Sequence, residues 1–248
     1  MAGHSHWAQI KHKKAKSDAQ RGKLFSKIIR EITVAVRQGG PNPETNPRLR
    51  AAIEHAKKAN MPAETIERAI KKGTGELGGE NYEEVIYEGY GPGGVALMIL
   101  ATTDNRNRTT SEIRHILSKH GGNLGSSGCV AFLFDRVGLI EVPRESISEE
   151  ELYEKAIEAG AEDVQVGEEI YLIYTLPEDL YQAKEKLQSM GVLVEKAEIT
   201  YKPNSTVPVN DPETAQKLLK LLEALEELED VREVIANFDM AEELIKQA

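Results

Sequence analysis

Cysteine and long apolar runs are scarce in this sequence of 248 residues. Its single cysteine, Cys129, excludes an internal disulfide and a cysteine-rich zinc site, as is typical of a reducing compartment. No apolar run approaches the roughly 20 residues that a membrane helix needs. The N-terminus is polar and then basic, without the apolar stretch of a signal peptide. We therefore expect a cytoplasmic protein with no membrane partner.

The sequence also lacks the residue patterns of an active site. It shows no nucleophile beside a base, no paired acid and base, and no cofactor fingerprint. His4 and His6 could begin a metal site, but no Cys, Asp or Glu stands near them, so we interpret them as incidental polar residues. We expect no catalytic residue, no metal and no cofactor. A metal-dependent hydrolase is the least favoured function.

Charge, in contrast, is abundant and unevenly distributed. Residues 1–72 carry 16 Lys and Arg against six Asp and Glu, a net of +10. The remaining 176 residues carry 15 against 35, a net of −20, so the overall net charge of −10 hides the difference. A basic segment of this kind is typical of a protein with a polyanionic partner. Because no lipidation signal or apolar insertion face accompanies it, nucleic acid is favoured over a membrane surface.

The basic segment begins with an arm, residues 1–22, that has no sustained apolar period and therefore only a weak helical tendency. From Lys23 onward apolar residues follow a helical period, with basic residues on the opposite face. Lysines and arginines on the arm and this face would contact phosphates, and Trp7 and the histidines could stack on bases or hydrogen-bond to them. The predicted nucleic-acid-binding residues are His6, Trp7, Lys11, His12, Lys13, Lys14, Lys16, Arg21, Lys23, Lys27 and Arg30.

A second basic site is predicted in residues 103–109, a polar loop between a strand and a helix. A capping box of Thr109 and Glu112 would begin the helix. Helix N-termini have free N–H groups and a positive dipole end, so Arg106 and Arg108 nearby could bind phosphate or an acidic partner. The alternative is a turn in which Asp104 pairs with its neighbouring arginines.

Periodicity predicts an α+β fold in which helices come first and two sheets follow. Three short amphipathic helices are expected, the second beginning with Asn46 as its cap and Pro47 in its first turn. They can bury their apolar stripes only against one another. Residues 138–199 read as strand, helix, strand, strand, helix, strand, the ferredoxin-like succession, with strands expected over 138–142, 163–166, 170–175 and 192–199. The preceding strands, expected over 82–88, 95–102 and 129–134, lack a helix and a strand. Residues 212–237 could supply both and so complete a second ferredoxin-like α+β domain.

Three domains follow from this pattern. Residues 1–78 are the basic arm and helical domain with its linker. Residues 79–135 and 205–248 form a discontinuous α+β domain, and residues 136–204 are a ferredoxin-like α+β domain inserted within it. We expect a monomer.

Five runs give the sequence a recognisable signature. They are Met1-Ala-Gly-His-Ser-His-Trp-Ala-Gln-Ile-Lys-His-Lys-Lys-Ala15, Asp18-Ala-Gln-Arg-Gly-Lys-Leu-Phe-Ser-Lys27, Gly89-Tyr-Gly-Pro-Gly-Gly94, Thr103-Asp-Asn-Arg-Asn-Arg-Thr109 and Gly121-Gly-Asn-Leu-Gly125. With these runs the chain closely resembles the YebC/PmpR family over essentially its full length. Cys129 stands where that family often has Ser, which argues against a functional thiol.

The resemblance implies a three-domain cytoplasmic protein, usually labelled a transcriptional regulator that binds DNA. It also implies a competing role in protein synthesis, since relatives include the mitochondrial translational activator of cytochrome oxidase subunit one. Ribosome-associated relief of stalling at proline stretches has been proposed for bacterial relatives. Duplex DNA and ribosomal RNA are both bound through phosphates, so charge does not separate them. On a ribosome, the acidic remainder would face solvent or basic ribosomal proteins.

Overall fold

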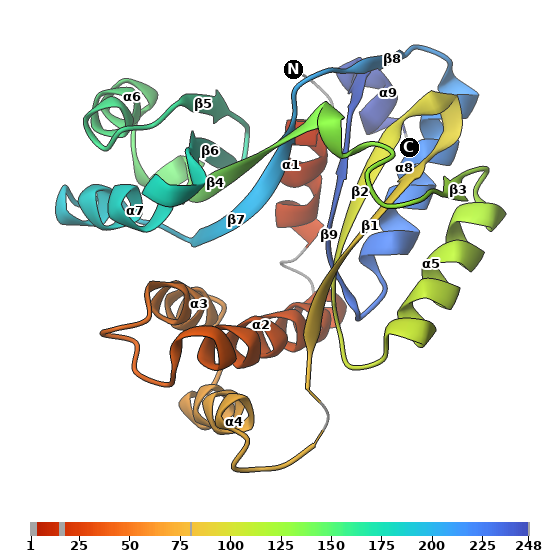
Figure 1. Cartoon of the computed structure of the whole chain (residues 1–248). Helices are drawn as coiled ribbons and strands as arrows, with labels where there is room; N and C mark the ends of the chain where they lie inside the picture. Colours follow the sequence, from red (N-terminus) through yellow and green to blue (C-terminus); the bar gives the residue numbers. More distant parts are fainter. Residues whose placement is uncertain (1–3, 15–17, 80, 248) are drawn as a thin grey trace. The chain divides into compact units, whose positions relative to one another are not determined.

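The structure is a computed structural model that describes residues 4–14, 18–79 and 81–247, with side chains described for 7–13 and from Gln20 onward apart from Glu80. Four helices come first, followed by antiparallel sheets with their own helices (Figure 1). This arrangement confirms the predicted α+β fold class. The chain forms two compact units. The first comprises Met1–Ala8, Asn81–Asp135 and Lys202–Ala248, and the second comprises Gln9–Glu80 and Arg136–Tyr201.

The N-terminal helices are α1 (His4–Lys14), α2 (Asp18–Gly39), α3 (Pro47–Lys58) and α4 (Ala63–Thr74). The expectation of an arm over residues 1–22 is wrong for the part that the structure describes, because α1 forms and α2 begins at Asp18. Most of the described residues there are good helix formers, and Gly22 within α2 costs only about 1 kcal/mol relative to Ala.

Helices α2, α3 and α4 share one core, made of residues such as Ile32, Leu49 and Ile66. Asn46 caps α3 as predicted: its side chain accepts the Leu49 N–H and donates to the carbonyl oxygens of Ala35 and Gly40. Gly73 allows α4 to approach α2, because a Cβ there would lie 2.7 Å from the Cβ of Val36.

The second unit also holds a ferredoxin-like sheet with strand order β5-β6-β4-β7. Its elements, in chain order, are β4 (Phe134–Pro143), α6 (Glu149–Glu158), β5 (Asp163–Val166), β6 (Ile170–Thr175), α7 (Leu180–Ser189) and β7 (Lys196–Pro203). The core lies between the sheet and the two helices, with Tyr171, Leu152 and Leu187 at its centre.

Two strand predictions need correction. The strand expected over 129–134 does not form before Phe134, the first residue of β4, and Ala131–Leu133 forms the 3-10 turn η2 instead. The strand expected over 192–199 is shifted to β7, because Val192 and Val194 enter the core from an irregular segment. Apolar side chains mark burial in both cases, but burial alone does not require a strand.

The first unit has a sheet of order β3-β1-β2-β9. Its strands are β1 (Glu83–Tyr90), β2 (Ala96–Thr103), β3 (Asn123–Leu124) and β9 (Val231–Ala236), all paired antiparallel. Helices α5 (Arg106–Lys119) and α8 (Pro212–Glu226) lie side by side on one face of it (Figure 1). Short strands β8 (Val207–Val209) and β10 (Phe238–Met240) pair in parallel, and α9 (Glu242–Lys246) follows.

Candidate nucleic-acid interface

Three of the predicted binding residues lie outside the described side chains. Lys16 belongs to the undescribed segment 15–17, and the side chains of His6 and Lys14 are not described although their backbones belong to α1. These three positions remain predictions.

Exposed cations are distributed over the N-terminal helices. Lys13 of α1, and Arg21 and Lys23 of α2, are exposed, while Lys11 and Lys27 are half-buried. Lys57 of α3 and Lys71 of α4 are also exposed, and sequence patterns did not single them out. The side chains of Lys13, Lys57 and Lys71 make no hydrogen bond or ion pair with a described residue. They are therefore ready to accept a phosphate without breaking an internal contact.

Two other predicted residues are buried. Trp7 is 4% exposed and Arg30 is 7% exposed. The indole Nε1 of Trp7 has no hydrogen-bond partner among the described residues. Arg30 was placed on the basic face of a helix by periodicity, yet its side chain is covered. Neither residue is presented on an open surface of the molecule.

His12 contacts residues next to the ferredoxin-like sheet within the second unit. Its Nε2 lies 2.7 Å from Oε2 of Glu195, just before β7, and its Nδ1 lies 4.0 Å from a carboxylate oxygen of Glu169. Burial would raise the pKa of Glu195, but the hydrogen bond and the charge of His12 outweigh it, so this pKa is lowered. One turn earlier, Gln9 donates to the Ile170 carbonyl and accepts the Glu169 and Ile170 N–H groups. The C-terminal half of α1 therefore serves the fold of the second unit.

Helix α3 makes a second set of contacts with the same domain. Lys184 of α7, which is 1% exposed, lies 2.9 Å from the Glu54 carboxylate. Arg50 pairs with Glu185, and Lys58 donates to the Val194 carbonyl. The charges are complementary, because residues 136–201 carry six Lys and Arg against 16 Asp and Glu. Part of the basic charge of the helical domain is therefore neutralised within the second unit.

His55 lies in the same contact region. Its Nδ1 is 3.1 Å from the Glu195 carbonyl oxygen. Burial, aided by the positive charge of Lys196, lowers the pKa of His55 to about 4. The imidazole is therefore neutral at physiological pH and adds no charge for binding phosphate.

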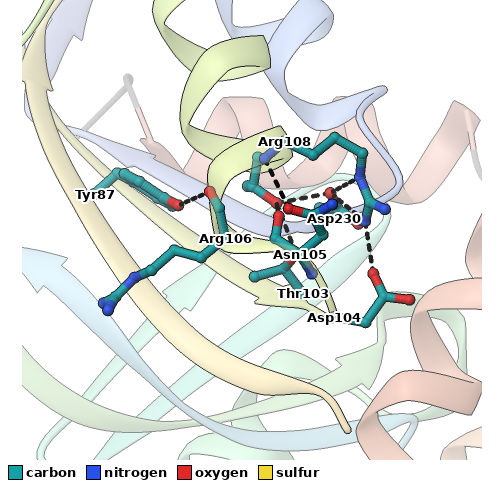
Figure 2. Close-up of polar contacts among 8 residues, drawn as sticks. Tyr87, Thr103, Asp104, Asn105, Arg106, Arg108 and Asp230 are labelled. Carbon is teal, nitrogen blue, oxygen red and sulfur yellow. Dashed lines mark hydrogen bonds and ion pairs between the residues drawn. The ribbon is translucent and has the colours of Figure 1, made fainter. Parts of the chain in front are cut away.

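Arg106 and Arg108 lie in the first turn of α5, not in a loop, because Asn105 caps this helix and Thr109 lies inside it. Figure 2 shows Arg108 directed at two carboxylates and Arg106 directed away from them. Arg108 Nη2 lies 2.8 Å from Oδ1 of Asp104 and 2.8 Å from Oδ1 of Asp230. These hydrogen bonds raise the pKa of Arg108 further above its usual range.

Asp230 is the residue of this cluster that the sequence did not reveal. It is 3% exposed, lies just before β9, and also accepts a hydrogen bond of 2.7 Å from the Thr109 hydroxyl. The pairing that joins α5 to β9 spans 122 residues, so no local pattern could have indicated it. The alternative of an internal turn thus applies to Arg108, whereas the Arg106 side chain is exposed and has no partner among the described residues.

The loop after α5 is held by a second buried carboxylate, that of Glu88. Glu88 of β1, 5% exposed, accepts the N–H groups of Gly128, Val130 and Ala131 at 2.6, 3.1 and 2.7 Å. Cys129 lies in this loop and is half-buried, where burial and then the charge of Glu88 raise the pKa of its thiol. A raised pKa keeps the thiol protonated and unreactive.

Within the described ranges, no group of three or more His, Cys, Asp or Glu side chains is placed to hold a metal ion. In the same part of the chain, no helix is both long and apolar enough to cross a membrane. The candidate binding groups in the described residues are therefore the exposed cations on α1 to α4 and at the start of α5.

Known proteins resemble this chain over nearly its whole length. A family model described as the TACO1/YebC protein N-terminal domain matches residues 5–76, and one described as the TACO1/YebC second and third domain matches residues 82–238. A "Probable transcriptional regulatory protein" of Aquifex aeolicus is 73% identical over 247 residues, 100% of this chain and 99% of that protein. A protein of the same name from Persephonella marina is 63% identical over 248 residues, with the same coverage.

A solved structure is equally similar. The crystal structure of a conserved hypothetical protein from Aquifex aeolicus has a TM-score of 0.92 and 74% sequence identity, and the match covers 96% of this chain and 98% of that one. The resemblance to the YebC/PmpR family that the sequence motifs predicted is confirmed. This chain therefore belongs to the TACO1/YebC family.

Proposed function

We propose that this protein is a non-enzymatic regulator that acts by binding nucleic acid, with duplex DNA of promoter regions as its principal ligand. The names of its relatives support a role in transcriptional regulation. We further propose that it acts as a monomer in the cytoplasm.

The observation that carries the proposal is the uneven charge. Residues 9–80 have 16 Lys and Arg against eight Asp and Glu, a net of +8, although the whole chain has a net charge of −10. Contacts in the second unit neutralise some of these cations, but Lys13, Lys57 and Lys71 stay exposed. Exposed lysines that replace the counterions of a phosphate backbone supply the sequence-independent part of nucleic-acid affinity.

A second candidate is a translation factor that binds ribosomal RNA and relieves stalling at proline stretches. One observation favours it. Between Leu24 and Val36 no residue of α2 is exposed, so the longest helix of the basic region offers no open row of side chains for reading bases in a major groove. Binding through phosphates alone suits a folded RNA as well as a duplex.

A competition experiment at near-physiological salt tests the proposal. The full-length protein is offered a labelled promoter-region duplex, a scrambled duplex of equal length, and ribosomes. A preference for the promoter duplex by about a thousandfold or more, the ratio typical of specific readers, would support the transcriptional function. Equal weak binding to both duplexes, together with co-sedimentation on ribosomes, would contradict it and support the translation factor.

A further inference from the structure

One aromatic side chain is held outward on the surface of the first unit. Phe132, at the centre of η2 (Ala131–Leu133), is 70% exposed and is the most exposed aromatic residue in the described part of the chain. The residues two positions before and after it are buried, since Val130 is 0% exposed and Phe134 is 6% exposed. The two buried residues anchor the turn and leave Phe132 facing solvent.

The backbone around Phe132 is fixed from two sides. On one side, the buried Glu88 carboxylate accepts three N–H groups of the preceding segment, from Gly128, Val130 and Ala131. On the other side, Asn204 donates its side-chain amide to the Phe132 carbonyl at 3.1 Å and its backbone N–H to the Leu133 carbonyl at 2.9 Å. The turn is therefore ordered before any ligand arrives.

The arrangement fixes a turn that holds an apolar ring in solvent. A single exposed apolar residue is common on protein surfaces and usually has no special role. Here, however, a carboxylate is buried, which is unfavourable unless hydrogen bonds compensate, and its three hydrogen bonds all fix the segment that leads to Phe132. The Phe132 ring itself contributes little buried area. The Phe132 ring is therefore exposed on a turn whose backbone is already fixed, as is suitable for binding a ligand.

We propose that Phe132 is a stacking platform for an unpaired nucleobase of bound RNA or DNA. The inference rests on the proposed binding of nucleic acid, and it deepens that function by adding one requirement: the bound DNA or RNA presents a base that is not paired, beside the part that the exposed cations hold. Bases inside a duplex are already stacked on both faces, so only an unpaired base can lie on the ring. Every base has a π-face, so this contact adds affinity without selecting a sequence. A backbone that is already fixed also loses little conformational entropy on binding.

The test uses the full-length protein and two probes, a single-stranded 12-mer RNA and its DNA equivalent, each with a central 2-aminopurine. The same oligonucleotides annealed to their complements serve as duplex probes. Binding of the wild-type protein should quench the fluorescence of the single strands. The Phe132→Ala variant should bind the single strands roughly five- to a hundredfold more weakly, the range expected when one stacked base is lost, and should lose the quenching. Its binding to the duplexes should not change.

Two further variants sharpen the result. Phe132→Trp should restore both affinity and quenching, because the indole also stacks. Ile157→Ala removes an equally exposed apolar side chain, 74% exposed on α6, and should bind like the wild type. A stronger effect on the RNA than on the DNA single strand would identify RNA as the source of the base.

Three results would overturn the inference. Stacking on Phe132 is excluded, while the proposed function stands, if the wild-type protein binds the duplexes but not the single strands. The same holds if Phe132→Ala binds the single strands as well as the wild type does, or loses no more affinity than Ile157→Ala. If the wild-type protein binds none of the four probes, the proposed function fails and the inference fails with it.

Discussion

The N-terminal helices and the first turn of α5 are both basic, but they use their charge in different proportions. In the first turn of α5, Arg108 forms ion pairs with Asp104 and Asp230 and so stabilises the fold, whereas the side chain of Arg106 is exposed and has no partner among the described residues. In the helices, Arg48, Arg50 and Lys58 have partners within the second unit, while Lys13, Lys57 and Lys71 have none among the described residues. Net charge alone therefore overestimates the surface available to a polyanion.

The largest effect on stability is expected from removing a cation that is paired with a buried carboxylate. Arg108→Ala leaves the buried carboxylate of Asp230 without its guanidinium partner. Removing one partner of a buried pair typically costs 3 to 5 kcal/mol, and because Arg108 itself is 41% exposed we expect the lower end, about 3 kcal/mol. Denaturant unfolding measures this loss. A change below about 1 kcal/mol would show that Asp230 does not depend on Arg108.

A smaller effect on stability is expected from pH, through His55. Its pKa in the folded protein is about 4, below its ordinary value of 6.5. The unfolded chain therefore binds a proton more readily, and the stability that the neutral imidazole supports is present above pH 6.5 and is lost as pH falls toward 4. We expect a loss of roughly 2 kcal/mol for this half-buried group.

The control for this prediction is His55→Gln, which cannot titrate. Burial raises the pKa of Glu141, which affects stability in the opposite direction on acidification, and the difference between wild type and variant removes that contribution. Equal pH dependence of the free energy of unfolding in both proteins would contradict the assignment.

Arg106 supplies the matched comparison with Arg108. Arg106→Ala removes the same charge from the same helical turn. Arg106 contacts its neighbours through its backbone carbonyl, which accepts the hydroxyls of Thr110 at 2.8 Å and Tyr87 at 3.5 Å and is kept in the variant, so stability should change by less than about 0.5 kcal/mol. Nucleic-acid affinity should fall several-fold, roughly 1 kcal/mol, as for one exposed charged contact. Filter binding to the promoter-region duplex measures the affinity of both proteins. An unchanged affinity would show that Arg106 is not part of the interface.

Local signals were sufficient for much of the fold. Asn46 followed by Pro47 marked the start of α3, and the succession of apolar periods identified the ferredoxin-like order of strands and helices. Errors arose where local signals conflict. Thr109 with Glu112 looked like a capping box, yet Asn105 caps α5, because an N-cap is decided by which side chain reaches the free N–H groups. The boundaries of the three predicted domains remain a prediction.

The candidate site was less predictable than the fold. Composition identified the basic segment, but not which cations are paired, since those partners lie far away in sequence: Glu195 is 183 residues from His12, and Asp230 is 122 residues from Arg108. Phe132 was hidden for a similar reason. It lies in an apolar run that suggests a buried strand, and the groups that fix its turn, Glu88 and Asn204, lie far away in sequence.

The central claim is that exposed cations bind nucleic acid while paired cations stabilise the fold, and one measurement tests it most directly. Two triple variants each remove three positive charges from the N-terminal helices, one at Lys13, Lys57 and Lys71, and the other at Arg48, Arg50 and Lys58, all changed to Ala. The slope of log affinity against log salt is measured for each folded protein with the same duplex. Each lost phosphate contact should reduce the slope by about 0.9, so the first variant should lose between 2 and 3 in slope and the second close to none. Equal losses in both variants, or a larger loss in the second, would contradict the account.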